Sequence, residues 1–301
     1  MTFEIFGCGT IRSLFPKSIA KCLVNLQSLE IFNCHMLAEV VSADARENEV
    51  TKICERLEFP KLRIVNLSSL TQFKSFTSQS NSGFDRQTLF NQVNFPNVEC
   101  MDVKRLDCTV KLIEFDSIQS LQSLEYLHVL ECKAFQVLFD FEGMKVTNDD
   151  AEINMLGRLE TLLLTDLPQL VNIKRMVPEG IRVFQNLTNL DVTGCESLRY
   201  LFSLSIVNSL VALEELSIDN CKALEEIIGR EEEENTSETR NIVMDANTPS
   251  NLHHFTQVVS MDAKRNGVID MLEFPKLNSL VLIGLSNFKS FRFESNNDSI
   301  I

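Results

Sequence analysis

Residues 184–202 read FQNLTNLDVTGCESLRYLF and residues 210–228 read LVALEELSIDNCKALEEII, and the two stretches align without a gap. Both follow the frame L-x-x-L-x-[IV]-x-x-C-x-x-[LF]-x-x-[LVI]. Residues 23–41 and 121–139 follow the same frame. Internal repetition of this kind indicates stacked units, each of which is too small to bury its apolar face alone.

A second kind of copy has Leu at the position of the Cys. Residues 59–76, 156–173 and 274–291 follow it, residues 95–110 follow it weakly, and the tail of a further copy starts at Phe3. The first anchor of the frame recurs at Leu26, Leu62, Val98, Leu124, Leu159, Leu187, Leu213 and Leu277. These intervals run from 26 to 36 residues, with a last interval of 64. Leucine-rich repeats are about 20 to 29 residues long, so several copies carry insertions.

The spacing inside each copy predicts one strand. The last two apolar residues of L-x-x-L-x-L lie two apart, which is the period of a strand with one face turned inward. We therefore expect an α/β fold: a leucine-rich-repeat solenoid, or horseshoe, with a concave parallel sheet and an irregular, partly helical convex side. The expected strands are residues 28–32, 64–68, 100–104, 126–130, 161–165, 189–193, 215–219 and 279–283.

The whole chain, residues 1–301, is expected to form a single domain. It should contain about eight to nine irregular repeats. Insertions are expected near residues 42–58, 77–94 and 229–273, which are respectively charged, rich in Ser and Asn, and acidic. The third insertion is interpreted as a solvated loop, because it starts with a run of charges and has few apolar residues.

Two of the segments that connect one expected strand to the next have the spacing of apolar residues that is typical of a helix. Apolar residues lie four and eight positions after Phe15, and again four and eight positions after Phe202. Such intervals mark one face of a helix. We therefore expect a short helix at each of these two places on the outer side of the solenoid.

The nine cysteines favour a reducing, intracellular compartment. Their number is odd and no Cys-x-x-Cys pair occurs, so zinc-ribbon spacing is absent. The sequence shows neither a signal peptide nor an apolar run long enough to span a membrane, so we expect a cytoplasmic protein. The cysteines of the frame, Cys34, Cys132, Cys195 and Cys221, are interpreted as free, buried packing residues at the turn.

The formal net charge of −14 disfavours some classes of partner. An acidic chain repels nucleic-acid phosphates and anionic membrane surfaces, so neither is expected to bind. The four His follow no metal-ligand spacing such as H-E-x-x-H, and there is no G-x-S-x-G elbow. We therefore expect no enzyme activity, no cofactor and no metal site, and we predict a protein-binding module.

The alternation of Cys-containing and Leu-containing copies resembles the leucine-rich-repeat region of plant intracellular disease-resistance proteins of the coiled-coil, nucleotide-binding class. The LF-x-x-S-I connector at Leu14 and Leu201 and the acidic EEIIGREEEE at residues 225–234 add to the resemblance, which covers nearly the whole chain. The resemblance implies a region that senses a pathogen effector, or the host protein guarded against it. It also implies a region that restrains a nucleotide-binding domain.

The sequence departs from a complete receptor of this kind. It has no G-x-x-x-x-G-K-[ST] phosphate loop and no coiled coil, so we expect a fragment or a truncated paralogue, with the nucleotide-binding domain absent from this chain. The alternative is a generic leucine-rich-repeat adapter, such as the substrate-recognition subunit of a ubiquitin ligase. Such an adapter needs a docking domain, and no F-box-like helical segment precedes the repeats.

The candidate partner-binding surface is the concave face of the sheet. In each strand the residue between the two inward apolar residues points outward, and so does the residue two positions later. Apolar residues lie among acidic ones in these two rows; the mixture can mark a partner site, although single exposed apolar residues are also ordinary. The candidate residues are Glu30, Phe32, Asn66, Asp102, Lys104, His128, Leu130, Leu163, Asp191, Ser217, Asp219, Val281 and Ile283.

Overall fold

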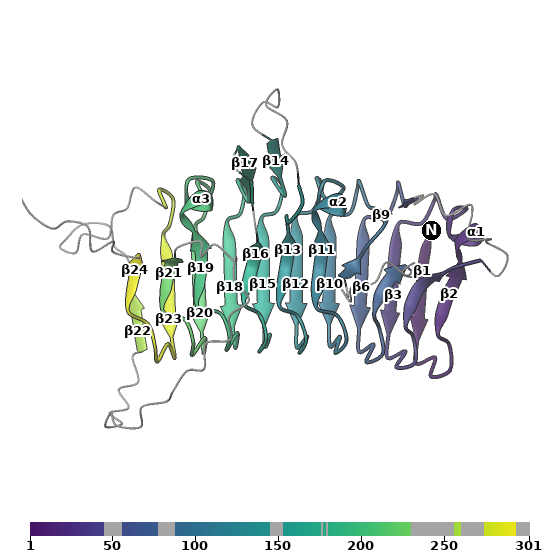
Figure 1. The fold of residues 1–301 in the computed structure, drawn as a ribbon, viewed down its shortest axis with the longest axis horizontal. Coiled ribbons are helices and arrows are strands. Elements are labelled where there is room, and N and C mark those ends of the chain that lie inside the picture. Colours follow the sequence, from purple (N-terminus) through teal and green to yellow (C-terminus); the bar gives the residue numbers. More distant parts are fainter. Residues whose placement is uncertain are drawn as a thin grey trace, which may run out of the picture.

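The fold is a solenoid whose main sheet runs along its whole length (Figure 1). This computed structural model describes residues 1–44, 56–77, 88–144, 153–175, 177–178, 180–229, 256–259 and 274–292. Nine parallel strands of the main sheet come from successive copies: β1 (Thr2–Phe6), β3 (Ser28–Phe32), β6 (Ile64–Ser68), β10 (Cys100–Lys104), β12 (Tyr126–Leu130), β15 (Thr161–Thr165), β18 (Asn189–Thr193), β20 (Glu215–Asp219) and β23 (Ser279–Ile283). The eight predicted strands are confirmed with their predicted bounds, and the partial copy at Phe3 supplies β1.

The C-terminal edge of the sheet carries a strand that the sequence analysis does not anticipate. β22 (Thr256–Val259) pairs antiparallel with β23 and comes from the stretch expected to be a solvated loop. The other residues of that stretch, from 230 to 273, lie outside the described residues. The same holds for residues 45–55 and 78–87 of the other two expected insertions.

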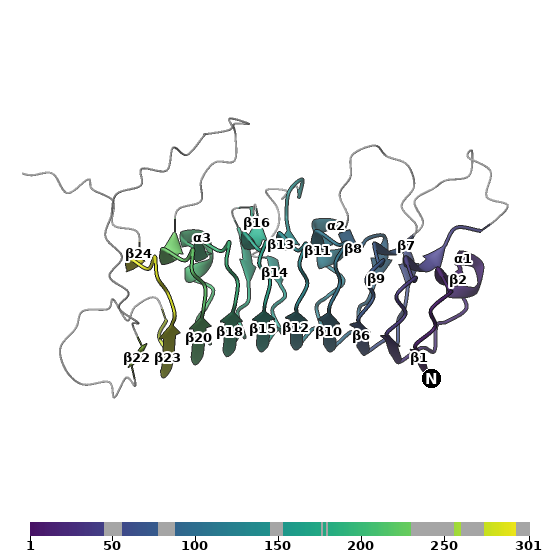
Figure 2. The same ribbon diagram turned by 90° about the horizontal axis from the view of Figure 1, so that it is seen from below.

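The alternation of side chains in each strand explains why the copies stack. In β18, Leu190 and Val192 are buried, whereas Asn189, Asp191 and Thr193 are half-buried on the opposite face. The register pairs buried residues with buried residues from one strand to the next. The inward side chains therefore form continuous apolar rows, and the main sheet lines the inner side of a shallow arc (Figure 2).

Each strand of the main sheet is followed by a residue with a left-handed backbone. In the nine copies φ at this position lies between 52° and 67°. In the first eight copies the amide of this residue donates a hydrogen bond to the last carbonyl of the next strand, as Asp166 does to Thr193 over 2.8 Å. The chain thus turns away from the sheet without leaving this amide unpaired, which a buried corner requires.

The frame cysteines occupy the position after this corner and are buried, as predicted. Cys34, Cys132, Cys195 and Cys221 have no exposed surface. The thiol of Cys221 donates to the carbonyl of Asp219 over 3.5 Å, and the other three make the same contact two residues back. A small thiol therefore fills the corner and pairs one carbonyl there.

Short parallel strands, and not helices, make up most of the convex side. They pair copy to copy in three runs: β2 (Ser13–Pro16), β4 (Glu39–Ser42) and β7 (Ser75–Thr77); β8 (Thr88–Phe90), β11 (Lys111–Glu114), β13 (Val137–Asp140) and β16 (Asn172–Arg175); and β19 (Tyr200–Ser203), β21 (Glu226–Gly229) and β24 (Ser290–Arg292). Two further pairs are β5 (Leu57–Glu58) with β9 (Val93–Asn94), and β14 (Ile153–Met155) with β17 (Ile181–Val183). β8 and β9 lie within the second expected insertion.

The helices are single turns. α1 (Lys17–Ala20) and α3 (Leu204–Val207) lie in the two segments with helical spacing, and α2 (Phe115–Ile118) lies in a third segment that the spacing did not indicate. Ile206 is buried but Ile19 is 49% exposed, so the matching intervals do not define the same face in both places. The expected partly helical convex side thus reduces to these three turns in the described residues.

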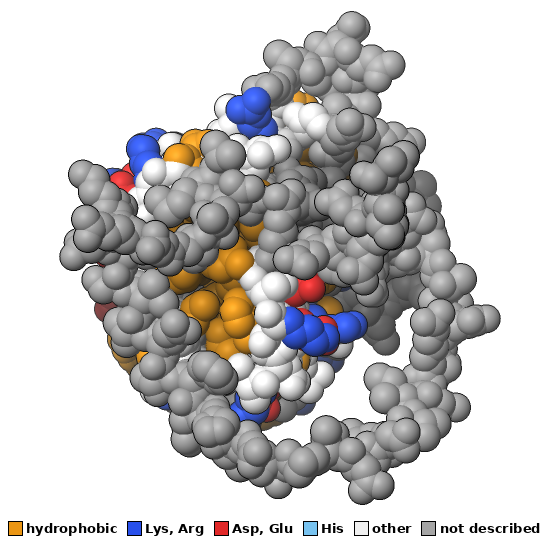
Figure 3. All heavy atoms as spheres, turned by 90° about the vertical axis from the view of Figure 1, so that its left-hand side faces the viewer, with side chains coloured by type: hydrophobic (Ala, Val, Ile, Leu, Met, Phe, Trp, Pro, Cys, Tyr) orange, Lys and Arg blue, Asp and Glu red, His pale blue; other side chains and the backbone are white. Residues whose placement is uncertain are grey.

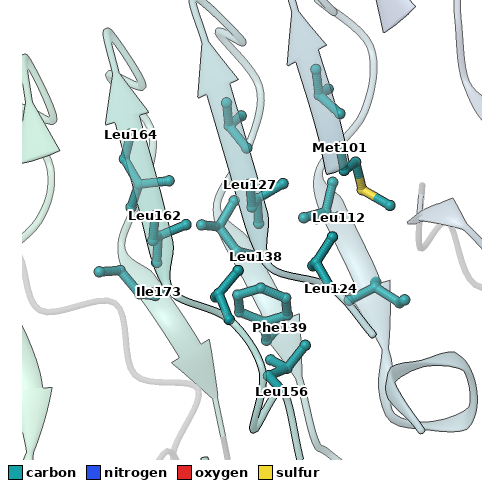
Figure 4. Packing of buried hydrophobic residues seen from close by; sticks show 14 of the residues in the cluster. Met101, Leu112, Leu124, Leu127, Leu138, Phe139, Leu156, Leu162, Leu164 and Ile173 are labelled. Carbon is teal, nitrogen blue, oxygen red and sulfur yellow. The ribbon is translucent and has the colours of Figure 1, made fainter. Parts of the chain in front are cut away.

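One apolar core runs the length of the solenoid between the two layers. Figure 4 shows how residues of the main sheet, such as Leu127 and Leu162, meet residues of the convex side, such as Leu138 and Phe139. Phenylalanines fill the wider places: the rings of Phe76 and Phe95 pack edge to face with centroids 5.3 Å apart. Side chains of this size dominate the burial of a core, which accounts for the use of Phe here.

A buried ion pair interrupts the convex side of this core. The ammonium group of Lys111 on β11 contacts the carboxylate of Asp140 on β13, and both side chains are almost wholly buried. Glu114 lies 3.9 Å from the same ammonium group and accepts a hydrogen bond from Thr88 over 2.8 Å. The charges are therefore paired across β11 and β13, and Thr88 of β8 adds a hydrogen bond to Glu114.

Apolar side chains are partly exposed at the C-terminal end of the solenoid. Leu282, Leu285, Phe288 and Phe291 of the last copy are only partly buried. Figure 3 looks at this end and shows hydrophobic side chains among the described residues. The last copy is covered by a neighbour on one side through β20 and by β22 on the other, where β22 spans four residues.

Candidate recognition surface

The two predicted rows lie on one face of the main sheet. The register places Asn66 beside Asp102, Asp102 beside His128, and His128 beside Leu163. The predicted row starts at Glu30, which Glu4 of β1 precedes in the structure, and it continues through Asp191, Ser217 and Val281. The second row contains Phe32, Lys104, Leu130, Asp219 and Ile283, with Ser68, Thr165 and Thr193 between them. Neighbouring strands lie about 4.8 Å apart, so each row is a continuous line of side chains.

A third row shares the same face and is absent from the predicted set. It consists of the first residue of each strand, because residues at intervals of two point the same way. Its members are Thr2, Ser28, Ile64, Cys100, Tyr126, Thr161, Asn189, Glu215 and Ser279. The period of two that defines the other rows could have located this one as well.

The N-terminal end of the face is aromatic. Phe6 on β1 and Phe32 on β3 stack with ring centroids 4.8 Å apart and an interplanar angle of 13°. Phe6 is 61% exposed, and Ile64 on the next strand but one is 42% exposed. The hydroxyl of Ser28 donates to the carboxylate of Glu30 over 2.9 Å, so an acid lies beside the stacked rings.

Polar side chains gather at the middle of the face. Asp102 forms an ion pair with Lys104 over 2.6 Å, and Nδ1 of His128 lies 3.4 Å from the other carboxylate oxygen. Burial lowers the pKa of His128, and the nearby Asp102 only partly opposes this effect. The imidazole is therefore neutral at pH 7, and the Oδ1 atoms of Asp102 and Asn66 are buried without a hydrogen-bond donor in the described residues.

Charges are paired along β6, β10 and β12 and the rim beside them. Arg63 pairs with Glu99 over 2.6 Å, and Arg105 pairs with Glu131 over 2.8 Å. Hydrogen bonds from these arginines lower the pKa of both Glu99 and Glu131. Arg158 pairs with Glu125 in the same way over 2.6 Å. These acids thus have a basic partner within the chain, whereas Glu4 on β1 and Glu30 on β3 form no ion pair with a described residue.

Three segments of the C-terminal part of the face contain no Lys or Arg: residues 160–166, 188–194 and 214–220. These segments hold β15, β18 and β20 with the residues next to them. They carry six acids, none of which forms an ion pair with a described residue. We call these six the acidic half of the face: Glu160, Asp166, Asp191, Glu214, Glu215 and Asp219.

The described residues hold no cluster of three or more His, Cys, Asp or Glu side chains that could bind a metal ion. Among these residues, no helix is long and apolar enough to cross a membrane.

The buried thiols Cys132 and Cys195 behave as packing residues. Hydrogen bonding to the Cys221 thiol and burial raise the pKa of Cys195 well above its usual value, and burial raises that of Cys132 to about 12.

A constant apolar core under a face that changes at every strand defines a leucine-rich-repeat recognition module. The described geometry therefore assigns the chain to the class of leucine-rich-repeat proteins. The family model for the leucine-rich repeats of RPS2-like plant disease resistance proteins matches residues 1–86 and 73–222. The chain therefore belongs to this family, whose repeats serve recognition and are generally not catalytic. A comparison with curated proteins finds no match.

Proposed function

We propose that the concave face binds a protein ligand, either a pathogen effector or a host protein that an effector alters. We also propose that the repeats restrain a nucleotide-binding domain carried outside this chain. The observation that supports binding is the contrast between the two faces of each strand. Inward positions are apolar in every copy, whereas the neighbouring outward positions change from Asn66 to Asp102, His128 and Leu163.

The cysteines support an intracellular setting for this function, which we propose to be the cytoplasm. All eight cysteines in the described residues are free thiols. Thiols persist in the reducing cytoplasm and are oxidised in secreted proteins. The frame cysteines contribute to the core as thiols, so the proposed setting and the packing agree.

The test is capture of neighbours by proximity labelling in plant tissue challenged with a pathogen. The face variant combines His128→Ala, Leu163→Ala and Asp191→Ala, which truncates three adjacent outward side chains. The matched control combines His35→Ala, Val171→Ala and Glu196→Ala, three exposed residues outside the strands of the main sheet. We expect the face variant, and not the control, to lose a set of labelled proteins.

Equal labelling by the wild type, the face variant and the control would contradict binding through the concave face. Capture of ubiquitin-ligase core subunits, unchanged by the face variant, would instead favour the adapter alternative. Circular dichroism of both purified variants verifies that each keeps its fold. A loss caused by unfolding would appear there, because parallel strands dominate the structure.

A further inference from the structure

The acidic half of the face gathers six carboxylates on three neighbouring strands and the residues beside them, with no Lys or Arg in the same segments. Glu160, Glu214 and Glu215 are exposed, and Asp191 and Asp219 lie half-buried in the sheet. The described residues provide no ion pair for any of them. Along β6 to β12, in contrast, Arg63, Lys104 and Arg105 pair with neighbouring acids.

Two of these acids reach into the sheet surface. The hydroxyl of Thr193 donates to Oδ1 of Asp191 over 2.9 Å, and the described residues provide no donor to the other carboxylate oxygen. Oδ1 of Asp219 is buried and has no hydrogen-bond donor among the described residues. A buried acceptor without a donor is costly, so a partner that brings a donor to this place gains free energy.

Aliphatic side chains separate the acids. Leu163 lies beside Asp191 in the middle row, and Val281 lies one strand beyond Ser217 in the same row. Ile283 lies beside Asp219 in the next row. The combination suits side chains that are apolar along the stem and cationic at the tip, because Lys and Arg stems pack on apolar surface while their charge reaches an acid.

From this unpartnered sheet face we infer that the acidic half docks a basic segment of a partner protein, rich in Arg or Lys. The inference rests on the proposed function and specifies the chemistry of the ligand for that surface. Negatively charged occupants are disfavoured, because the carboxylates of this surface repel them. A second copy carries a net charge of −14, and nucleic acid and anionic membranes repel the same carboxylates.

The experiment measures binding of a synthetic peptide by fluorescence anisotropy. The probe is a 12-residue peptide with Arg and Lys alternating with Leu and Val, compared with the same peptide carrying Glu in place of each cation. The full chain is used at low and at high ionic strength. We expect the basic peptide to bind, the acidic peptide not to bind, and added salt to weaken binding because exposed charges are screened.

The site variant combines Asp191→Asn, Glu215→Gln and Asp219→Asn, which removes charge with little change in shape. The control combines Glu99→Gln, Glu125→Gln and Glu131→Gln, which removes the same charge from the paired part of the face. We expect the site variant to bind the basic peptide about tenfold more weakly than the wild type and the control. Glu215→Gln alone, at an exposed position, gives a smaller loss if the triple variant does not fold.

Equal losses in the two triple variants would show that only net charge matters and would overturn the inference. So would the absence of binding by the basic peptide. A concentration-dependent dimer that the site variant loses would identify a second copy as the occupant and would also overturn it. If tissue labelling still depends on His128, Leu163 and Asp191 while the peptide fails, the proposed function stands and the basic ligand does not.

Discussion

The turn after each strand of the main sheet requires a left-handed backbone at one position. Nine copies place a residue with φ between 52° and 67° there, and only Gly7, Gly194 and Gly284 are glycines. Asn and Asp tolerate this conformation better than most other residues, and larger side chains adopt it at a cost of about 1 kcal/mol. The repeated amide-to-carbonyl bond of the corner offsets that cost in the first eight copies.

Gly194→Ala should destabilise the chain by about 1 to 3 kcal/mol. The backbone has φ of 67°, and an added Cβ would clash with Oδ1 of Asp166. Gly7→Ala is the control, because φ is 63° there and nothing lies within 4 Å of the added atom. Urea unfolding should show a larger loss at Gly194; equal losses would mean that the contact with Asp166 relaxes freely.

The Cys132 thiol should react far more slowly with iodoacetamide than the exposed Cys22 thiol. Burial raises the pKa of Cys132 to about 12, and the thiolate is the reactive form. Mass spectrometry after timed labelling of the native chain at pH 8 measures both rates. Comparable rates would show that the corner opens readily and does not pack as the structure has it.

His128 should make the stability of the chain fall in mild acid. Burial lowers its folded-state pKa below the ordinary value of 6.5, so the unfolded chain binds a proton more readily. The contribution is complete above pH 6.5 and is lost as the pH falls from there through the folded-state pKa. His128→Gln should reduce the difference in unfolding free energy between pH 7.5 and 5.5; an unchanged difference would show that other groups cause it.

At the scale of elements, the main sheet could be predicted from the sequence and the convex side could not. Apolar residues two apart, such as Leu190 and Val192, allow only a strand with one buried face, and the bounds followed from them. On the convex side adjacent residues such as Leu138 and Phe139 are both buried. A continuous apolar run has no period, so it distinguishes neither helix from strand nor one pairing from another.

The buried pair on the convex side gives a test at this scale. Asp140→Ala should destabilise the chain by about 3 kcal/mol or more, because the Lys111 ammonium group stays buried and Glu114, 3.9 Å away, is the acid left to it among the described residues. The double variant Lys111→Met, Asp140→Leu should lose much less, since no charge remains to be buried. Thermal unfolding of the three chains decides, and an equal loss in both variants would contradict a cost that arises from unpaired charge.

At the scale of the whole molecule, the candidate face was predictable in outline. The strand period located the rows that contain Asp102 and Asp191, and it would also have located the row that contains Glu215. Which acids find a basic partner was not predictable from spacing alone. Arg63 meets Glu99 across 36 residues of sequence, and only the stacking of copies brings them together.

Deletion of residues 189–214 should leave a folded, shorter solenoid. Copies at this point are 26 residues apart, as the contact of Lys222 with Glu196 shows, so the deletion joins Thr188 to Glu215 in frame. Stability in a solenoid is nearly a sum over copies and their contacts, so the melting temperature should fall only modestly. Deletion of residues 195–214 breaks the frame and should unfold the neighbouring copies, which circular dichroism and gel filtration would reveal.

The spacing of the strands also limits what a ligand can match. An extended chain laid across the sheet repeats its same-side residues about every 6.8 Å, whereas the strands beneath repeat about every 4.8 Å. The two periods come back into step only after about seven strands, nearly the full width of this sheet. A ligand crossing the face therefore meets a different offset at each strand. Exchanging one outward residue therefore changes the contact with the ligand at one strand and leaves the contacts at the other strands unchanged.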